Sequence, residues 1–125
     1  MLNVALTLAG IIGATTAIVH GILTNRLMTR PVDAHLSRDR RVSAAIRTLV
    51  PLLLQYSTYS WLIGGIALIA VANGWQPGAR IAIGLLVGSM FLYGAVANLW
   101  GTRGRHPGWM LMALAVALIA FDLLG

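Results

Sequence analysis

The sequence predicts an all-α integral membrane protein: a four-helix bundle with a short cytoplasmic amphipathic helix between helices 1 and 2. Three observations lead to this prediction: the apolar composition, four long apolar segments and the uneven distribution of arginine. Of the 125 residues, 58% are hydrophobic and 10% are charged, whereas a soluble domain carries about 25% charged residues. This composition indicates that lipid surrounds most of the chain, and no polar stretch is long enough to form a second domain.

Four apolar segments have the length of membrane-spanning helices, since a helix needs about 20 residues to cross the hydrocarbon core. Soluble helices would present polar faces to water, and these segments have almost none. We therefore expect a single domain, residues 1–125, with four spans. The spans are residues 4–24, 49–72, 79–100 and 107–124.

Arginine supplies the whole positive charge of the chain, nine residues against three aspartates, and eight of the nine lie in the first and third connections between spans. Arginine is retained on the cytoplasmic side during membrane insertion, so both connections are expected in the cytoplasm and both termini outside. The net positive charge predicts contacts with the lipid bilayer and its anionic headgroups, and not with nucleic acid. The candidate headgroup ligands are Arg38, Arg40, Arg41 and Arg47.

The first connection contains an amphipathic pattern, because Val42, Ile46 and Leu49 recur at helical spacing. Lying flat on the membrane, such a helix buries its apolar stripe and offers its arginines to phosphates. Ser37 or Asp39 is the expected N-cap. Pro51 comes next, and we expect a bend of the chain over residues 48–51.

Small residues recur every fourth position in the first span, and a Gly-x-x-x-Gly pair lies in the third. In lipid, helices associate through close backbone approach at small residues. The pattern predicts either packing within the bundle, which we favour, or a face for homo-oligomers. The candidate helix-packing residues are Gly13, Ala17, Gly21, Gly84 and Gly88.

Residues 55–61 form an unusual polar and aromatic run inside the second span. By helical rise, His20 of the first span should lie at the same depth and face Gln55, Tyr56 or Tyr59. Two interpretations remain open: interhelical hydrogen bonds of a structural core, or a polar cavity for a small ligand or ion. The candidate cluster is His20, Gln55, Tyr56, Tyr59, Tyr93 and Asn98.

The sequence offers little support for a metal site, a catalytic site or a bound cofactor. Cysteine is absent, the three histidines are scattered, and the aspartates lie in connections or at the chain end, so we expect no metal site, no catalytic residues and no cofactor. The sequence favours a non-enzymatic membrane protein that packs with itself or as an accessory subunit of a larger membrane complex. The alternative is an oligomeric channel or carrier for a small ion or solute.

Two resemblances accompany these patterns. Residues 10–14 (Gly-Ile-Ile-Gly-Ala) and 56–60 (Tyr-Ser-Thr-Tyr-Ser) resemble small fluoride channels, whose Thr-Phe-Ser-Thr-Phe-Ser run lies in the third span and not the second. Residues 19–20 (Val-His), 30–31 (Arg-Pro) and 106–109 (His-Pro-Gly-Trp) look like those of uncharacterised small four-helix bacterial inner-membrane proteins. The second resemblance implies a bacterial inner membrane and supplies no activity.

Overall fold

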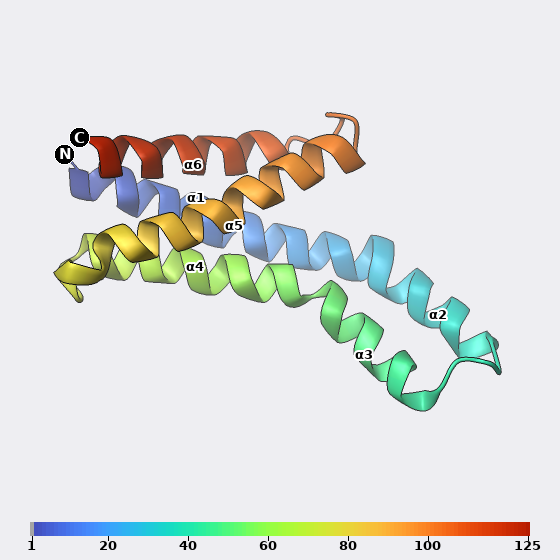
Figure 1. Ribbon diagram of the computed structural model, residues 1–125. Helices are drawn as coiled ribbons and strands as arrows, with labels where there is room; N and C mark the ends of the chain where they lie inside the picture. Colours follow the sequence, from blue (N-terminus) through green and yellow to red (C-terminus); the bar gives the residue numbers. More distant parts are fainter. Residues whose placement is uncertain (1) are drawn as a thin grey trace.

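The protein folds as four apolar helices packed side by side, and the structure, a computed structural model, describes residues 2–125. Met1, part of the predicted domain, lies outside the described residues. The central helix α1 packs against α4 and α6, and α5 packs against α6 and, less extensively, α4 (Figure 1). The prediction of an all-α, four-helix protein is confirmed. The four helices are α1 (Leu2–Thr24), α4 (Tyr56–Ala72), α5 (Arg80–Gly101) and α6 (Gly108–Leu124).

Among the described residues, three helical stretches are long and apolar enough to cross a membrane: Asn3–Arg38, Ala44–Ala72 and Pro77–Gly101. The fourth, Gly108–Leu124, is apolar but shorter. By length and hydropathy, the chain is therefore a multi-pass membrane protein.

The first connection forms a helical hairpin that projects beyond the bundle, and it differs from the single amphipathic helix that we predicted. Helix α1 continues through a π-helical turn, η1 (Asn25–Thr29), into α2 (Arg30–Arg38). A return helix, α3 (Ala44–Leu54), packs against α2 and leads into α4 (Figure 1). At 1.5 Å per residue the continuous stretch from α1 to α2 is about 54 Å long, well beyond a hydrocarbon core of about 30 Å.

The N-cap of α3 is Ser43, whose hydroxyl accepts the backbone N–H of Ile46 at 3.3 Å. The predicted caps, Ser37 and Asp39, were wrong because both side chains have other partners. The Ser37 hydroxyl donates to the carbonyl four residues before it at 2.8 Å. The Asp39 carboxylate accepts the backbone N–H two residues after it at 2.9 Å and so shapes the turn between the two helices.

The bend in the second span lies one helical turn later than predicted. Pro51 lies inside α3, and the helix is interrupted at Gln55. The backbone N–H of Gln55 is shared between the carbonyls of Pro51 (3.3 Å) and Leu52 (3.2 Å). The Gln55 side chain donates to the Gly21 carbonyl at 3.1 Å, and this bond draws the interruption toward α1.

The closest approach in the bundle is between α1 and α4. A Cβ added at Gly10 would lie 2.6 Å from the carbonyl oxygen of Gly65, and a Cβ at Gly65 would lie 2.6 Å from the carbonyl oxygen of Gly10. Only two glycines allow the backbones to cross at this distance. Phe91, which is completely buried, fills the neighbouring space on α5 and packs against Gly13.

The predicted helix-packing residues all lie at helix contacts inside the bundle. A side chain at Gly21 would meet Thr58 of α4, and one at Gly84 would meet Leu123 of α6. Gly88 faces Ile119 of α6, and Ala17 is fully buried. These small residues therefore pack against other helices of the same chain.

The charged side chains divide between the two ends of the bundle. Figure 1 shows both termini at the end that holds the α4–α5 turn, with the α5–α6 loop and the α2–α3 hairpin at the other. Six of the nine arginines lie in the first connection and two in the α5–α6 loop. Eight arginines therefore share one end. Of the predicted headgroup ligands, Arg38, Arg40 and Arg41 are exposed, whereas Arg47 donates to the Asp39 carbonyl at 2.9 Å and closes the hairpin turn.

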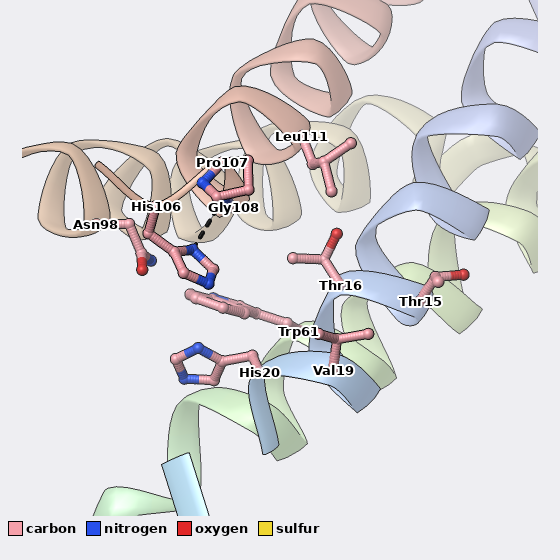
Figure 2. A pocket seen from close by; sticks show the side chains of 10 residues that line it. All are labelled: Thr15, Thr16, Val19, His20, Trp61, Asn98, His106, Pro107, Gly108 and Leu111. Atoms are coloured by element: carbon pink, nitrogen blue, oxygen red, sulfur yellow. Dashed lines mark hydrogen bonds between the residues drawn. The ribbon is translucent and has the colours of Figure 1, made fainter. Parts of the chain in front are cut away.

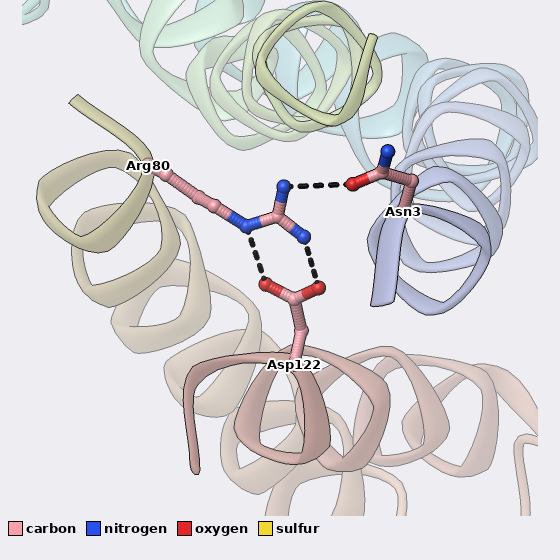
Figure 3. Close-up of polar contacts among 3 residues, drawn as sticks. All are labelled: Asn3, Arg80 and Asp122. Carbon is pink, nitrogen blue, oxygen red and sulfur yellow. Dashed lines mark hydrogen bonds and ion pairs between the residues drawn. The ribbon is translucent and has the colours of Figure 1, made fainter. Parts of the chain in front are cut away.

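The ninth arginine, Arg80, belongs to a polar clamp at the opposite end (Figure 3). Its guanidinium group forms a two-pronged ion pair with the fully buried carboxylate of Asp122, with one of the two bonds 3.0 Å long. It also donates to the side-chain oxygen of Asn3 at 2.9 Å. The clamp thus joins α1, α5 and α6 at the end of the bundle that holds both termini (Figures 1 and 3).

Candidate functional site

His20 of α1 and the polar run of α4 meet in the half of the bundle nearest the hairpin. The Nε2 atom of His20 lies 3.1 Å from the Ser57 hydroxyl and 3.2 Å from the Thr24 hydroxyl. The imidazole ring also stacks on Trp61, with the ring centroids 4.5 Å apart and the planes tilted by 49° (Figure 2). His20 therefore has local partners on both α1 and α4.

Gln55 lies at the depth of His20, yet the two side chains do not pair. Gln55 donates instead to the carbonyl of Gly21, the residue next to His20, and its own carbonyl accepts the hydroxyl of Thr58 at 3.0 Å. The positions of α4 that face α1 are thus Ser57, Thr58 and Trp61. Because successive side chains point in different directions around a helix, Tyr56 and Tyr59 point away from His20. Our expectation that His20 faces Gln55 or one of these tyrosines was wrong.

The three tyrosines of the predicted cluster lie on the outside. Tyr56 and Tyr59 on α4 are 67% and 64% exposed, and Tyr93 on α5 is 77% exposed. The structure therefore splits the predicted cluster in two. His20, Gln55 and Asn98 belong to the inner part, and the tyrosines belong to an outer face.

A cavity of about 180 Å³ lies beside the inner part, between α1, α4, α5, α6 and the loop before α6 (Figure 2). Its polar lining includes Thr16, His20 and Asn98. Asn98 donates its amide N–H to the Gly94 carbonyl at 2.8 Å, which leaves its amide oxygen as an acceptor. The full lining is Thr15, Thr16, Val19, His20, Trp61, Asn98, His106, Pro107, Gly108 and Leu111.

His106 completes this cavity, and the sequence did not identify it as a site residue. Its Nδ1 atom accepts the backbone N–H of Gly108 at 3.1 Å. The neutral ring therefore carries its proton on Nε2. Figure 2 shows that Trp61 lies between His106 on one side and His20 on the other. The only signal in the sequence was the His-Pro-Gly-Trp motif, because loop residues have no periodicity that reveals where they fold back.

A second, more open cavity of about 400 Å³ lies on the outer face between α4 and α5. Trp61 lines both cavities and so separates them. Its indole ring rests on Gly94 of α5, where any side chain would overlap it. The outer cavity is lined by Tyr56, Ser57, Ser60, Trp61, Ser89, Met90 and Tyr93.

Within residues 2–125, no group of three or more histidine, aspartate or glutamate side chains is placed to hold a metal ion. Comparisons of the chain with protein-family models, curated proteins and solved structures gave no match. The resemblances to small fluoride channels and to small four-helix bacterial membrane proteins therefore stay predictions.

Proposed function

We propose that the chain is a small, non-enzymatic integral membrane protein that acts by packing with a second copy of itself through the tyrosine face. We define the tyrosine face as the exposed hydroxyl-bearing side chains of α4 and α5: Tyr56, Tyr59, Ser89 and Tyr93. The single observation that carries the proposal is the exposure of three tyrosine side chains on α4 and α5.

The depth of Tyr93 makes its exposure costly. Counting from the middle of α5 at 1.5 Å per residue, Tyr93 lies only about 4 Å from the helix midpoint. Tyrosine in membrane proteins favours the headgroup region, where its hydroxyl meets water. A hydroxyl facing hydrocarbon loses its hydrogen bonds, so a partner that covers Tyr93 stabilises the membrane-embedded protein.

A second copy is the partner that fits this surface. Each tyrosine hydroxyl can both donate and accept a hydrogen bond, so a twofold contact of the face with itself is self-complementary. The Ser89 hydroxyl already donates to the Leu86 carbonyl at 2.7 Å and can only accept. The defined face consists of neutral side chains, and the 400 Å³ cavity beside Tyr93 offers room for a ring from the other copy. The small residues of α1 and α5 already pack against other helices of the same chain, so the tyrosine face is the surface that we propose for association.

The proposed location is the inner (plasma) membrane of a bacterium, with both termini outside the cytoplasm. Its support is the clustering of eight arginines at the hairpin end of the bundle, since arginine is retained in the cytoplasm. Arg38, Arg40 and Arg41, which are exposed at the end of the hairpin, would meet the anionic headgroups of that leaflet.

Native mass spectrometry in mild detergent tests the association. We expect a dimer for the wild type and a weaker dimer for the double variant Tyr59→Phe/Tyr93→Phe, which removes only hydroxyl groups. Two to four lost hydrogen bonds at about 0.6 kcal/mol each correspond to a Kd that is about eightfold to sixtyfold higher. Phe121→Leu, on the exposed side of α6, is the control and should leave the Kd unchanged. A strictly monomeric wild type would contradict the proposal.

The alternative, a channel or carrier, has less support from the packing. The centre of the bundle holds Phe91, Leu6 and Leu68, each with no exposed surface, and a four-helix bundle of this size is filled by such side chains. We therefore expect proteoliposomes that contain the protein to show no flux of fluoride or of common anions and cations above that of empty vesicles. A protein-dependent flux would favour the channel.

A further inference from the structure

We propose that the 180 Å³ cavity beside Trp61 is a binding site for a neutral phenol-class ligand, a single six-membered aromatic ring that carries a hydroxyl group. This inference is independent of the tyrosine face, because the cavity lies on the opposite side of Trp61. The cavity opens to the surface beside Val19 and Leu111, which are 51% and 46% exposed. Its volume has room for one ring, since an enclosed apolar cavity of about 150 Å³ in another protein binds benzene.

The apolar walls suit the faces of such a ring. Val19 and Leu111 line the cavity from α1 and α6, and Trp61 adds a flat aromatic surface. Figure 2 shows the open space bounded by Trp61, His106 and Leu111. Aromatic rings pack in offset or edge-to-face arrangements, and an indole wall allows both.

The α1 wall of the cavity includes a residue whose buried hydroxyl group has no partner. Thr16 is 8% exposed, and within residues 2–125 its Oγ1 atom has no hydrogen-bond partner. Thr16 lines this cavity, and its side chain projects from α1 toward α6 (Figure 2). Buried polar groups in folded proteins are nearly always paired. The Oγ1 atom has almost no accessible surface, so a rotation of the Thr16 side chain would bring this hydroxyl to a polar group of a ligand in the cavity.

Two further polar groups of the lining, one donor and one acceptor, match a hydroxyl group on the ligand. His106 presents an Nε2–H donor, because its Nδ1 atom is occupied by the Gly108 backbone N–H. Asn98 presents an amide oxygen acceptor, because its amide nitrogen is bonded to the Gly94 carbonyl. A phenolic oxygen both accepts and donates, so it matches such a pair. Benzene satisfies neither group, and a benzoquinone has no donor for Asn98.

The lining also favours a neutral ligand. In the part of the chain that the structure describes, neither arginine nor aspartate lines the cavity. A charged ligand would therefore lose its hydration without gaining a counter-ion. The Nε2 atom of His20 is already held by Ser57 and Thr24, so His20 supports Trp61 and leaves the polar recognition to the other side chains.

Titration of the full-length protein in detergent with phenol, anisole and benzene tests the assignment, with binding followed by ligand-observed NMR saturation transfer. We expect saturable binding with affinities in the order phenol, anisole, benzene. Anisole keeps an acceptor but lacks a donor for Asn98. Each unpaired group should weaken binding by about fivefold to tenfold.

Two variants connect the binding to this cavity. Thr16→Val keeps the shape of the side chain and removes the hydroxyl, and His106→Phe keeps a ring and removes the donor. Each should weaken phenol binding by about fivefold to tenfold and leave benzene binding nearly unchanged. Thr48→Val on α3, outside the cavity, is the matched control and should bind phenol as the wild type does.

Equal signals for phenol in the wild type and in both variants would mean that phenol only partitions into the micelle, and this result would overturn the assignment. Equal affinity of the wild type for phenol and benzene would also overturn it, because the polar lining would then play no part. This second comparison needs no variant, so the assignment stays testable if either substitution prevents folding.

Discussion

The indole ring of Trp61 stacks on the imidazole ring of His20, with their centroids 4.5 Å apart. This contact joins α1 to α4 at the depth where the bundle holds its two cavities, and Trp61 separates them. The hydrogen bond between His20 and Ser57 holds α4 in the rotation that places Trp61 there. The same rotation turns Tyr56 and Tyr59 outward, so the inner cavity and the tyrosine face have one structural origin.

Substitutions at His20 should separate the hydrogen bond from the ring stacking. His20→Phe keeps a ring against Trp61 and loses the bond to Ser57, and we expect it to lower the free energy of unfolding by about 0.6 kcal/mol. His20→Ala also loses the stacking, which contributes about 1 kcal/mol more. Unfolding in SDS titrations measures both values. Equal losses for the two variants would show that the stacking contributes nothing.

The glycine crossing of α1 and α4 gives a second prediction. In Gly65→Ala the new Cβ would lie 2.6 Å from the Gly10 carbonyl oxygen, so the helices must separate at a cost of about 1–3 kcal/mol. Gly101→Ala, at the end of α5, has nothing within 4 Å and should stabilise the protein by up to about 1 kcal/mol. The same unfolding assay compares the two. A neutral Gly65→Ala would contradict the close crossing.

The clamp at the end that holds both termini (Figures 1 and 3) predicts that substitutions of Arg80 and Asp122 have strongly coupled effects on stability. Asp122→Leu leaves the guanidinium group without its buried partner, and we expect a loss of about 3 kcal/mol. The double variant Arg80→Leu/Asp122→Leu removes both charges and should recover most of that loss, since a buried ion pair contributes little more than an apolar pair. Thermal unfolding in detergent measures the cycle. Strictly additive effects of the two substitutions would show that the pair is not coupled.

The sequence predicted the features that depend on composition and periodicity. The four apolar segments became α1, α4, α5 and α6, because apolar runs of this length have few other folded forms. The small residues of α1 lie at helix contacts, as Gly13 against Phe91 illustrates. Depth along a helix was also predictable, and for this reason Gln55 does lie beside the residue next to His20.

The direction in which individual side chains point was not predictable, because it depends on the rotational orientation of each helix about its own axis. Nothing in the run of residues 55–61 indicates that Ser57 and Trp61, and not the tyrosines, turn toward α1. His106 was missed for a related reason: its place in the cavity depends on the loop that brings α6 back along α5. The helix break at Gln55 was displaced from Pro51 by a tertiary bond to Gly21 that local sequence does not show.

Membrane orientation can be tested with single cysteines, since the natural chain has none. Gly78→Cys lies in the α4–α5 turn with open space around it, and Ser37→Cys lies in the hairpin. A membrane-impermeant maleimide should label the first in intact bacteria and the second only after lysis, because the proposed orientation places the arginine-rich end in the cytoplasm. The reverse pattern would overturn the orientation, and equal labelling would indicate both orientations.

Disulfide crosslinking at Ser89 in native membranes tests the proposed association most directly. Ser89 is exposed on the tyrosine face beside the outer cavity, and Ala117 is exposed near the middle of α6. Ser89→Cys and Ala117→Cys therefore place one thiol at similar depth on two different faces. We expect mild oxidation to convert Ser89→Cys to a reducible dimer and to leave Ala117→Cys monomeric. Equal crosslinking of both variants, or none at Ser89, would contradict packing through the tyrosine face.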